Sequence, residues 1–279
     1  MTDHAYDLAI LGCGTMGEAI AAGLLDGGVV SKDRLCLSVR RDARREELAS
    51  RYGVAVTLDN VAAARDARVV LVALKPQRLR AVLDDDAMRA ATAGGIVVSI
   101  AAGVALARLE HWLPGAHVVR AMPNTPCLIR EGMTVLAPGA GVSPEELTWL
   151  SKVFGSVGDV VVLEDKLMDV VTSLNGSGPA FCYVMLEALA DGGVMMGLPR
   201  DVALRIAARV FSGSAKMVLE TGFHPAALKD QVTTPAGSTI AGLLTMEDGR
   251  IRSVLARTIE AATKVAARLG EDGGSEAPG

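Results

Sequence analysis

A glycine-rich segment near the start of the chain has the residue types and spacing of a phosphate-binding turn. It reads Gly12-Cys13-Gly14-Thr15-Met16-Gly17, which is G-x-G-x-x-G, between an apolar run and a helical pattern. In that context the glycines allow a tight turn, close approach of the backbone to a pyrophosphate, and close packing of helix on strand. The alternative is a merely flexible loop. The residues predicted to bind a dinucleotide here are Gly12, Gly14, Thr15, Met16 and Gly17.

The end of the second predicted strand indicates which dinucleotide binds. NAD enzymes place an acidic residue there, which accepts a hydrogen bond from the ribose 2′-hydroxyl. This chain has Ser38, Arg40 and Arg41 instead, and Asp42 comes too late to serve without moving the ribose. A hydroxyl and two guanidinium groups can hold a 2′-phosphate through charge-assisted hydrogen bonds. The pattern therefore favours NADPH, with NADH as the weaker alternative, although Arg40 and Arg41 also fit a solvated helix start.

Two further loops follow predicted strands and are expected at the same edge of the sheet. They read Leu74-Lys75-Pro76-Gln77 and Ile100-Ala101-Ala102-Gly103. Ligands of open α/β sheets bind at the carboxyl ends of the strands, so we expect these loops to line the nicotinamide half of the cofactor. Pro76 can instead simply start a helix, and Gly103 can simply turn the chain. The further cofactor candidates are Asn60, Ala73, Lys75, Pro76, Ala101, Ala102, Gly103 and Asn124.

Composition excludes several classes of partner and site. The 279 residues carry a net charge of −4 and contain no basic block flanked by aromatics, so we expect no nucleic-acid partner. Without a basic, apolar leader or an apolar run of roughly 20 residues, we expect a cytoplasmic protein that makes no use of a membrane. The cysteines and histidines form no pattern of a metal site, a disulfide framework or a catalytic triad, and Cys127 fits buried packing better than a reactive thiol. Asn175-Gly176-Ser177 matches a glycosylation sequon, which we interpret as accidental.

The elements that must position these residues are those of an α/β protein. Short β-branched runs alternate with helical patterns over residues 1–163, as in a doubly wound sheet. Helical patterns alone follow, so we expect an all-helical second domain over residues 164–270 and a polar, disordered tail over residues 271–279. The predicted strands are Asp7–Leu11, Arg34–Val39, Val54–Val56, Val69–Ala73, Ile96–Ile100, Val118–Ala121, Thr134–Ala137 and Asp159–Leu163.

Three helices of the second domain have clear expected limits. Ser177, a hydroxyl residue just before Pro179, predicts the N-cap of a helix that runs to Gly197. A second helix is expected from Pro199 to Gly222. The last helix has an apolar stripe at helical spacing between Ile251 and Leu269, so we expect it to bury one face.

Five segments together resemble the pyrroline-5-carboxylate reductase family over residues 5–269. They are the glycine turn, Lys75–Gln77, Arg120–Pro126, Gly176–Ala180 and Val232–Thr239. The resemblance implies an N-terminal Rossmann-type domain and a C-terminal helical domain that forms a homodimer, with dimers that often assemble further. It also implies a small-molecule substrate, the cyclic imine L-1-pyrroline-5-carboxylate, which is reduced to L-proline in the final step of proline biosynthesis.

The same resemblance implies where the substrate binds. In such enzymes the amides of a Pro-Gly-Gly-x-Thr loop hold the substrate carboxylate, and the Thr hydroxyl reaches the ring nitrogen. The matching residues are Pro235–Thr239, so Thr239 is the implied catalytic residue, and it can also cap the following helix. Ala236 departs from the commoner Gly, and a positive φ there would cost about 1 kcal/mol or more. The implied substrate-binding residues are Ser177, Gly178, Pro235, Gly237, Ser238 and Thr239.

Imine reduction is consistent with the lack of the usual catalytic side chains. A protonated imine is already electrophilic, so an enzyme can work mainly by orientation, with nicotinamide C4 roughly 3–3.5 Å from the imine carbon. A related dehydrogenase of β-hydroxy acids would need a general acid or base, usually a Lys in the helix after Gly178, and residues 179–184 contain none. A protein that only senses NADPH would have no need of the Thr239 loop.

Overall fold

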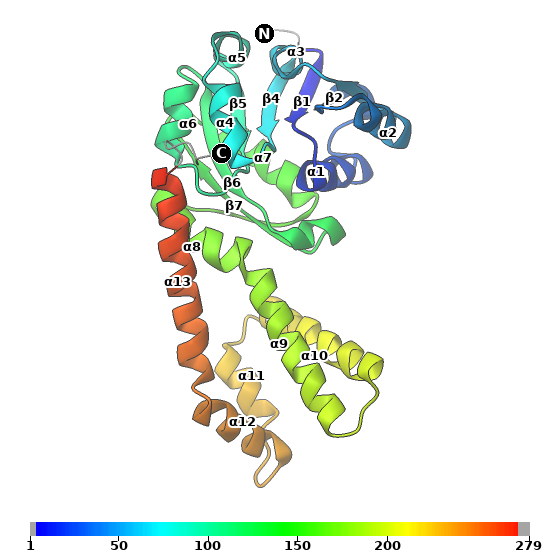
Figure 1. Cartoon of the computed structure of the whole chain (residues 1–279), viewed down its shortest axis with the longest axis vertical. Helices are drawn as coiled ribbons and strands as arrows, with labels where there is room; N and C mark the ends of the chain where they lie inside the picture. The colour runs from blue at the N-terminus through cyan, green and yellow to red at the C-terminus, as the bar shows by residue number, and fades with distance from the viewer. Residues whose placement is uncertain (1–3, 273–279) are drawn as a thin grey trace, which may run out of the picture. The chain divides into compact units, whose positions relative to one another are not determined.

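The computed structural model describes residues 4–272, which are coloured along the chain in Figure 1. The chain folds into two compact units. The first contains the residues up to Ser177 and those from Ala262 onward, and the second contains Gly178–Ala261. The last helix, α13 (Ile251–Asp272), contributes residues to both units.

The first unit is built on one eight-stranded sheet in the order β3-β2-β1-β4-β5-β6-β7-β8. Figure 1 labels six of these strands, β1, β2, β4, β5, β6 and β7. Every neighbouring pair is parallel except β6 with β7, which is antiparallel. Each strand overlaps one of the predicted runs, so the predicted Rossmann-type doubly wound sheet is confirmed. The strands are β1 (Tyr6–Leu11), β2 (Leu35–Ser38), β3 (Ala55–Thr57), β4 (Ala67–Val72), β5 (Ile96–Ser99), β6 (His117–Met122), β7 (Gly132–Pro138) and β8 (Gly158–Val162).

Alternate residues of the central strands face two separate cores, as the two-residue period of a strand requires. In β1, Leu8 and Ile10 lie in one core, and Ala9 and Leu11 lie in the other. Helices α1, α2 and α7 complete the first core, and α3 to α6 complete the second, so both faces of the sheet are covered and the central strands are mostly apolar. The helices are α1 (Thr15–Asp26), α2 (Asp42–Tyr52), α3 (Asn60–Arg65), α4 (Pro76–Leu83), α5 (Asp86–Thr92), α6 (Leu106–Trp112) and α7 (Pro144–Gly155), with short turns η1 (Lys32–Arg34) and η2 (Thr125–Ile129).

Three short helical segments after β8 belong to the same unit. They are η3 (Asp165–Leu167), α8 (Met168–Val171) and the π-helical η4 (Thr172–Gly176). Arg120 of β6, which is 3% exposed, joins them to the sheet through ion pairs with Asp165 at 3.0 Å and Asp169 at 3.5 Å. The first compact unit therefore includes residues after 163. The domain boundaries that the sequence predicts, at residues 163 and 270, stay predictions.

The helices of the second unit stop where the sequence predicts. Gly197 and Gly222 follow α9 and α10 with φ of +100° and +67°, the left-handed region that ends helices. The N-cap prediction for Ser177 is wrong: its φ of −87° and ψ of −22° are helical because η4 leads toward α9, whereas an N-cap is extended. The helices are α9 (Gly178–Met195), α10 (Arg200–Thr221), α11 (Pro225–Gln231), α12 (Ser238–Asp248) and the first part of α13.

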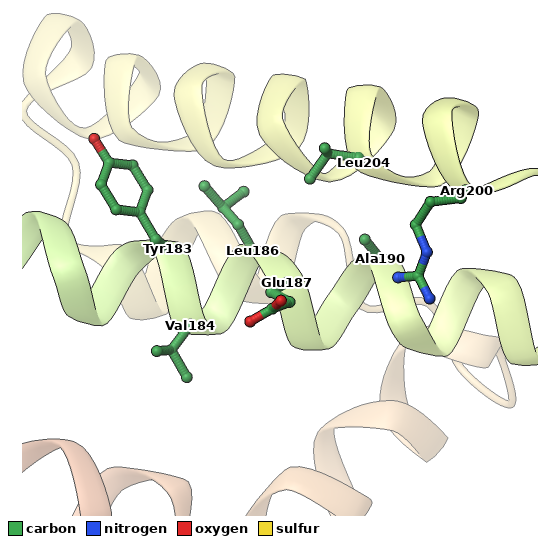
Figure 2. A pocket seen from close by; sticks show the side chains of 7 residues that line it. All are labelled: Tyr183, Val184, Leu186, Glu187, Ala190, Arg200 and Leu204. Carbon is green, nitrogen blue, oxygen red and sulfur yellow. The ribbon is translucent and has the colours of Figure 1, made fainter.

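Most large apolar side chains of the second unit are exposed. Its buried residues, among those whose side chains are described, are the alanines Ala190, Ala203 and Ala207. An open groove of about 390 Å³ lies between α9 and α10 (Figure 2). Along α13, Val254 and Val265 are 56% and 55% exposed, so the prediction that this helix buries one face is wrong for a single chain. An apolar stripe indicates that this face of the helix is buried in the assembled protein, and a single chain need not contain the surface that covers it.

The end of the chain departs from the predicted tail. Residues 271 and 272, placed in that tail by the sequence, are the last residues of α13, and residues 273–279 lie outside the described residues. Between residues 4 and 272, no helix is both long and apolar enough to cross a bilayer.

Replacing Asp165 tests how firmly the segments after β8 are tied to the sheet. Asp165→Asn keeps the shape of the side chain but removes a negative charge that faces the buried Arg120 guanidinium. We expect it to lower the free energy of unfolding by about 1–3 kcal/mol, measured by chemical denaturation at fixed protein concentration. The control is Asp159→Asn on β8, an exposed residue without an ion pair among the described residues, for which we expect little change. Equal effects of both substitutions would contradict the role given to the ion pair.

Candidate active site

The glycine turn joins β1 to α1, and glycine is required there at two positions. Gly12 has a φ of +75°, and a Cβ added to it would lie 2.4 Å from Leu74 Cδ2. A Cβ added to Gly17 would lie 3.1 Å from Ile10 Cγ2 and 3.3 Å from Ala73 Cβ. These are the tight turn and the close contact of helix with strand that the motif predicts.

Gly14 is the N-cap of α1, and the space around it is open. A Cβ added there would meet only Gly12 O, at 3.9 Å, and no side chain caps the helix. The amides of the first turn, which includes Thr15 and Met16, therefore have no side-chain partner and lie at the positive end of the helix dipole. This backbone fits the pyrophosphate of a dinucleotide.

Ser38, at the end of β2, supports the glycine turn. Its side chain is fully buried, and its hydroxyl accepts a hydrogen bond from Gly12 N at 3.2 Å and donates one to Asn60 Oδ1 at 2.5 Å. Its carbonyl oxygen accepts from Gly12 N at 3.1 Å and from Cys13 N at 2.8 Å. The hydroxyl is therefore engaged within the protein, and contact of Ser38 and Asn60 with a cofactor stays a prediction.

A cluster that the sequence did not indicate joins α1 to α2. Glu18, in the first turn of α1, accepts hydrogen bonds from Arg44, from Arg51 at 2.6 Å and from the Tyr52 hydroxyl at 2.9 Å. Burial acts to raise the pKa of Glu18, but these hydrogen bonds outweigh burial and hold the pKa below its ordinary value. The partners lie 26 to 34 residues from Glu18, a separation at which no local sequence pattern marks a pair.

The basic side chains nearest the end of β2 are free to meet an anion. Arg40 and Arg41 are exposed and, within the described part of the chain, pair with no carboxylate. Arg45 differs, because it forms an ion pair with Asp42 at 3.0 Å. Arg41 is the N-cap of α2 and has extended backbone angles. The two free guanidinium groups stand where the sequence predicts a 2′-phosphate.

The loops after β4 and β5 are neighbours at the carboxyl edge of the sheet, because those strands are parallel and adjacent. Lys75 is the exposed N-cap of α4 and Pro76 is its first residue, so the helix-start interpretation of Pro76 is confirmed. Gly103 turns the chain with a φ of +72°. Ala101 is buried, and Ala102 packs against a cluster that includes Met122 of β6. Contact of these residues with nicotinamide stays a prediction.

Asn124, in the loop after β6, is held by a residue that the sequence did not single out for function. Its amide nitrogen donates to Asn175 Oδ1 at 2.9 Å, and its oxygen accepts from Met133 N at 2.9 Å. The amide nitrogen of Asn175 donates to the carbonyl oxygens of Met122 at 2.7 Å and Met133 at 3.0 Å. The only sequence signal at Asn175 is the sequon, which gives no indication of this network.

The segment Pro235–Thr239 lies in the second unit and starts α12. Ala236 has a φ of +57°, so it takes the left-handed conformation that the commoner Gly would adopt without strain. Gly237 is the N-cap of α12, without a side-chain cap, and Ser238 is the first residue of the helix. Thr239 is therefore the second helical residue, and the interpretation of Thr239 as N-cap is wrong. The first-turn amides of α12 are available to a carboxylate.

Cys13, Cys127 and His224 have structural roles. Burial raises the pKa of the Cys127 thiol, and it raises that of Cys13 to about 12, so neither is a ready nucleophile. His224 caps α11 by accepting from Ala226 N, as a capping residue should. Residues 4–272 contain no group of three or more side chains suited to holding a metal ion.

Comparisons with known proteins agree with this geometry. Residues 165–269 match the family model described as pyrroline-5-carboxylate reductase dimerisation, and residues 7–103 match NADP oxidoreductase coenzyme F420-dependent. Curated pyrroline-5-carboxylate reductases are similar over nearly the whole chain. That of Synechocystis is 41% identical and covers 96% of this chain and 99% of its own, and that of Arabidopsis thaliana is 36% identical, covering 96% and 97%.

Solved structures show the same likeness. The pyrroline carboxylate reductase of Plasmodium falciparum with NADP bound matches with a TM-score of 0.84 at 26% identity, covering 96% of this chain and 99% of its own. The pyrroline-5-carboxylate reductase of Coxiella burnetii matches with a TM-score of 0.90 at 29% identity, covering 95% and 98%.

Replacing Ala236 with Gly tests the strain at the start of α12. Because Gly adopts positive φ without steric conflict, we expect Ala236→Gly to raise the free energy of unfolding by about 1 kcal/mol. Ala241→Gly is the matched control, since Ala241 lies within α12, and it should lower that free energy by about 1 kcal/mol. Chemical denaturation measures both. A loss of stability in Ala236→Gly would show that the left-handed residue carries no strain.

Proposed function

The chain belongs to the pyrroline-5-carboxylate reductase family, and from that membership we infer that it reduces L-1-pyrroline-5-carboxylate to L-proline with NADPH. The observation that carries this inference is the match to the Synechocystis reductase, at 41% identity over 96% of the chain. The protein is an oxidoreductase that acts on a C=N bond, and its product places it at the end of proline biosynthesis. Bound NADPH supplies the hydride, from nicotinamide C4, that the imine carbon accepts.

Orientation is the main task of the protein in this reaction. The carbon of a protonated cyclic imine is already electrophilic, so no side chain has to remove a proton before hydride arrives. Residues 179–184, in the first turns of α9, contain no Lys that could serve as the general acid or base of a β-hydroxy-acid dehydrogenase. The rate then depends on holding the two reacting carbons within roughly 3–3.5 Å of each other.

The cofactor part of the proposal rests on the edge of the sheet. The first-turn amides of Thr15 and Met16, after Gly14, bind the pyrophosphate, and the guanidiniums of Arg40 and Arg41, which pair with no carboxylate among the described residues, bind the 2′-phosphate. Ser38 shapes the glycine turn, and Asn60, which accepts a hydrogen bond from the Ser38 hydroxyl, is proposed to contact the adenosine half. The residues proposed around the nicotinamide half are Ala73, Lys75, Pro76, Ala101, Ala102, Gly103 and Asn124.

The substrate part of the proposal rests on the start of α12. The amides of Ser238 and Thr239, which have no side-chain cap, hold the substrate carboxylate at the positive end of the helix dipole, whereas Gly237 N donates to Thr234 O at 3.1 Å and shapes the turn. The Thr239 hydroxyl orients the ring nitrogen and steadies the amine as it forms. Pro235 fixes the backbone at the entrance to this turn, and Ser177 with Gly178 lets backbone come close to the ring.

We propose that the active protein is a homodimer formed through the helical unit, with dimers that can assemble further. Exposed apolar side chains on α9, α10 and α13 support this, since a second copy would remove them from water. The match of residues 165–269 to a dimerisation model supports it as well. Sedimentation of the purified protein measures the oligomeric state.

A cytoplasmic location completes the proposal. All four cysteines, Cys13, Cys36, Cys127 and Cys182, are free thiols, as is usual for proteins of reducing compartments. Fractionation of the cells that make the protein tests the location.

An assay of the purified protein tests the function itself. We expect it to oxidise NADPH in the presence of synthetic pyrroline-5-carboxylate and to release proline, detected by loss of NADPH absorbance and by amino-acid analysis. No turnover at saturating substrate would overturn the proposed function.

Removing the two free guanidiniums tests the cofactor assignment. Arg40→Ala combined with Arg41→Ala should raise the KM for NADPH by about 10- to 100-fold and leave that for NADH within about threefold, because only NADPH carries the 2′-phosphate. The control is Arg45→Ala, which removes a neighbouring guanidinium already paired with Asp42. It should change neither constant. Equal effects of the double substitution on both cofactors would remove the assignment.

Deleting one hydroxyl tests the role of Thr239. Thr239→Val keeps the shape of the side chain, and we expect kcat/KM for the imine to fall by about 10- to 100-fold because a hydrogen bond to a charged group is lost. Thr245→Val, on the same helix, removes a hydroxyl that only donates to Ala241 O and should leave kcat/KM unchanged. Wild-type efficiency in Thr239→Val would refute the role.

A further inference from the structure

The side-chain amides of Asn124 and Asn175 form a hydrogen-bond network at the point where β6 and β7 separate. The last pair of residues in register between these antiparallel strands is Met122 with Val135. Beyond it the chain leaves the sheet, and Asn175 bridges the gap by donating to the carbonyl oxygens of Met122 at 2.7 Å and Met133 at 3.0 Å. Asn124 completes the network between Asn175 Oδ1 and Met133 N. Side chains therefore replace the strand-to-strand hydrogen bonds at the base of this loop.

The network uses both donors of the Asn175 amide and one of the two lone pairs of its oxygen. Its nitrogen donates twice and its oxygen accepts once, so no other residue type of this size can make the same three contacts. Leu has nearly the same shape but no polar atom, and Asp has no donor when ionised. Either substitution would remove both donors to the carbonyl oxygens of Met122 and Met133, and Leu would also remove the acceptor for the Asn124 amide, in a half-buried site.

A π-helical turn presents Asn175 to the loop. η4 spans Thr172–Gly176, and Ser177 N donates to Thr172 O at 3.0 Å to close the wide ring of that turn. π-helical turns are rare in proteins as a whole, but those that do occur often lie at functional sites. The wider turn redirects side chains that an α-helix would point elsewhere. Here the redirected residue is Asn175, two positions before the predicted substrate residue Ser177.

The network lies where the nicotinamide half of the cofactor is expected. β6 is the parallel neighbour of β5, with Arg120 beside Ser99, so the loops after the two strands share one edge of the sheet. Ala102, in the loop after β5, packs in the same cluster as Met122 and Val171. The glycine turn follows β1, from which β6 is separated by β4 and β5. A substitution at Asn175 is therefore expected to affect the region proposed for the nicotinamide half of the cofactor and to leave the turn proposed to bind its pyrophosphate unchanged.

We propose that Asn175 is a positioning residue for hydride transfer. By holding the loop that carries Asn124 and the turn that leads to Ser177, it fixes two predicted neighbours of the reacting carbons without touching either carbon itself. This inference rests on the proposed function. Loss of the network lets the loop shift, and a shift of about 1 Å in such positioning costs about 100-fold in rate.

The test compares Asn175→Leu with wild type, after the wild-type protein has shown NADPH-dependent turnover of pyrroline-5-carboxylate. We expect kcat/KM for the imine to fall by about 30- to 100-fold, while the Kd for NADPH, from fluorescence titration, changes by less than about threefold. The deuterium isotope effect on kcat, measured with NADPH labelled at C4, should rise because hydride transfer becomes slower than product release. Partial unfolding alone would lower kcat in proportion to the folded fraction and leave the isotope effect unchanged.

Two more variants make the comparison decisive. Ser173→Ala removes a hydroxyl from the same π turn that donates only to Asp169 O, and it should keep wild-type constants. If Asn175→Leu does not fold, Asn175→Asp serves in its place, since it keeps the shape and the acceptor for Asn124 but lacks both donors. Wild-type kcat/KM in the Asn175 variant overturns the inference, and so does an unchanged isotope effect or an equal loss of NADPH affinity. Absence of turnover in the wild-type protein overturns the proposed function instead.

Discussion

Backbone amides without side-chain partners, at the first turns of α1 and α12, are the feature on which the proposed chemistry depends. Both helices have a glycine N-cap, Gly14 and Gly237, and neither helix has a side-chain cap. Most N-caps supply an oxygen that satisfies these amides. Leaving them open costs stability in the free protein but favours anion binding at two places, which we propose are the sites of a pyrophosphate and of a carboxylate. Positively charged side chains are then needed only to bind the 2′-phosphate of the proposed NADPH.

The rest of the fold can be understood as support for those two turns. The parallel strands bring successive loops to one edge, Ser38 holds Gly12 in place, and the Glu18 cluster fixes α2 beside α1. In the second unit, the left-handed Ala236 turns the chain into α12 so that the amides after Gly237 remain open. No side chain has to act as a general base or as a nucleophile in the reaction, which is consistent with a substrate whose carbon is already electrophilic.

The sequence predicted the parts that depend on local rules. Apolar runs marked all eight strands, and Gly197 and Gly222 marked helix ends, because period and glycine conformation are properties of short segments. It missed the contacts that join distant segments, such as Asn124 with Asn175, which are 51 residues apart. The alternative interpretation of Thr239 as an N-cap was wrong, because a Thr before an apolar run has the same pattern whether it lies at the cap or two residues later.

The exposed apolar side chains of the second unit affect how a newly made chain reaches its active form. The helices there enclose only alanines among their described side chains, so one copy gains little from burying apolar surface. For the homodimer proposed above, maturation would be a second-order process, in which encounter of two chains, rather than collapse of one, completes the hydrophobic core. At low abundance the helical half remains the part most exposed to proteases, and the cell's supply of active reductase rises more steeply than its rate of synthesis.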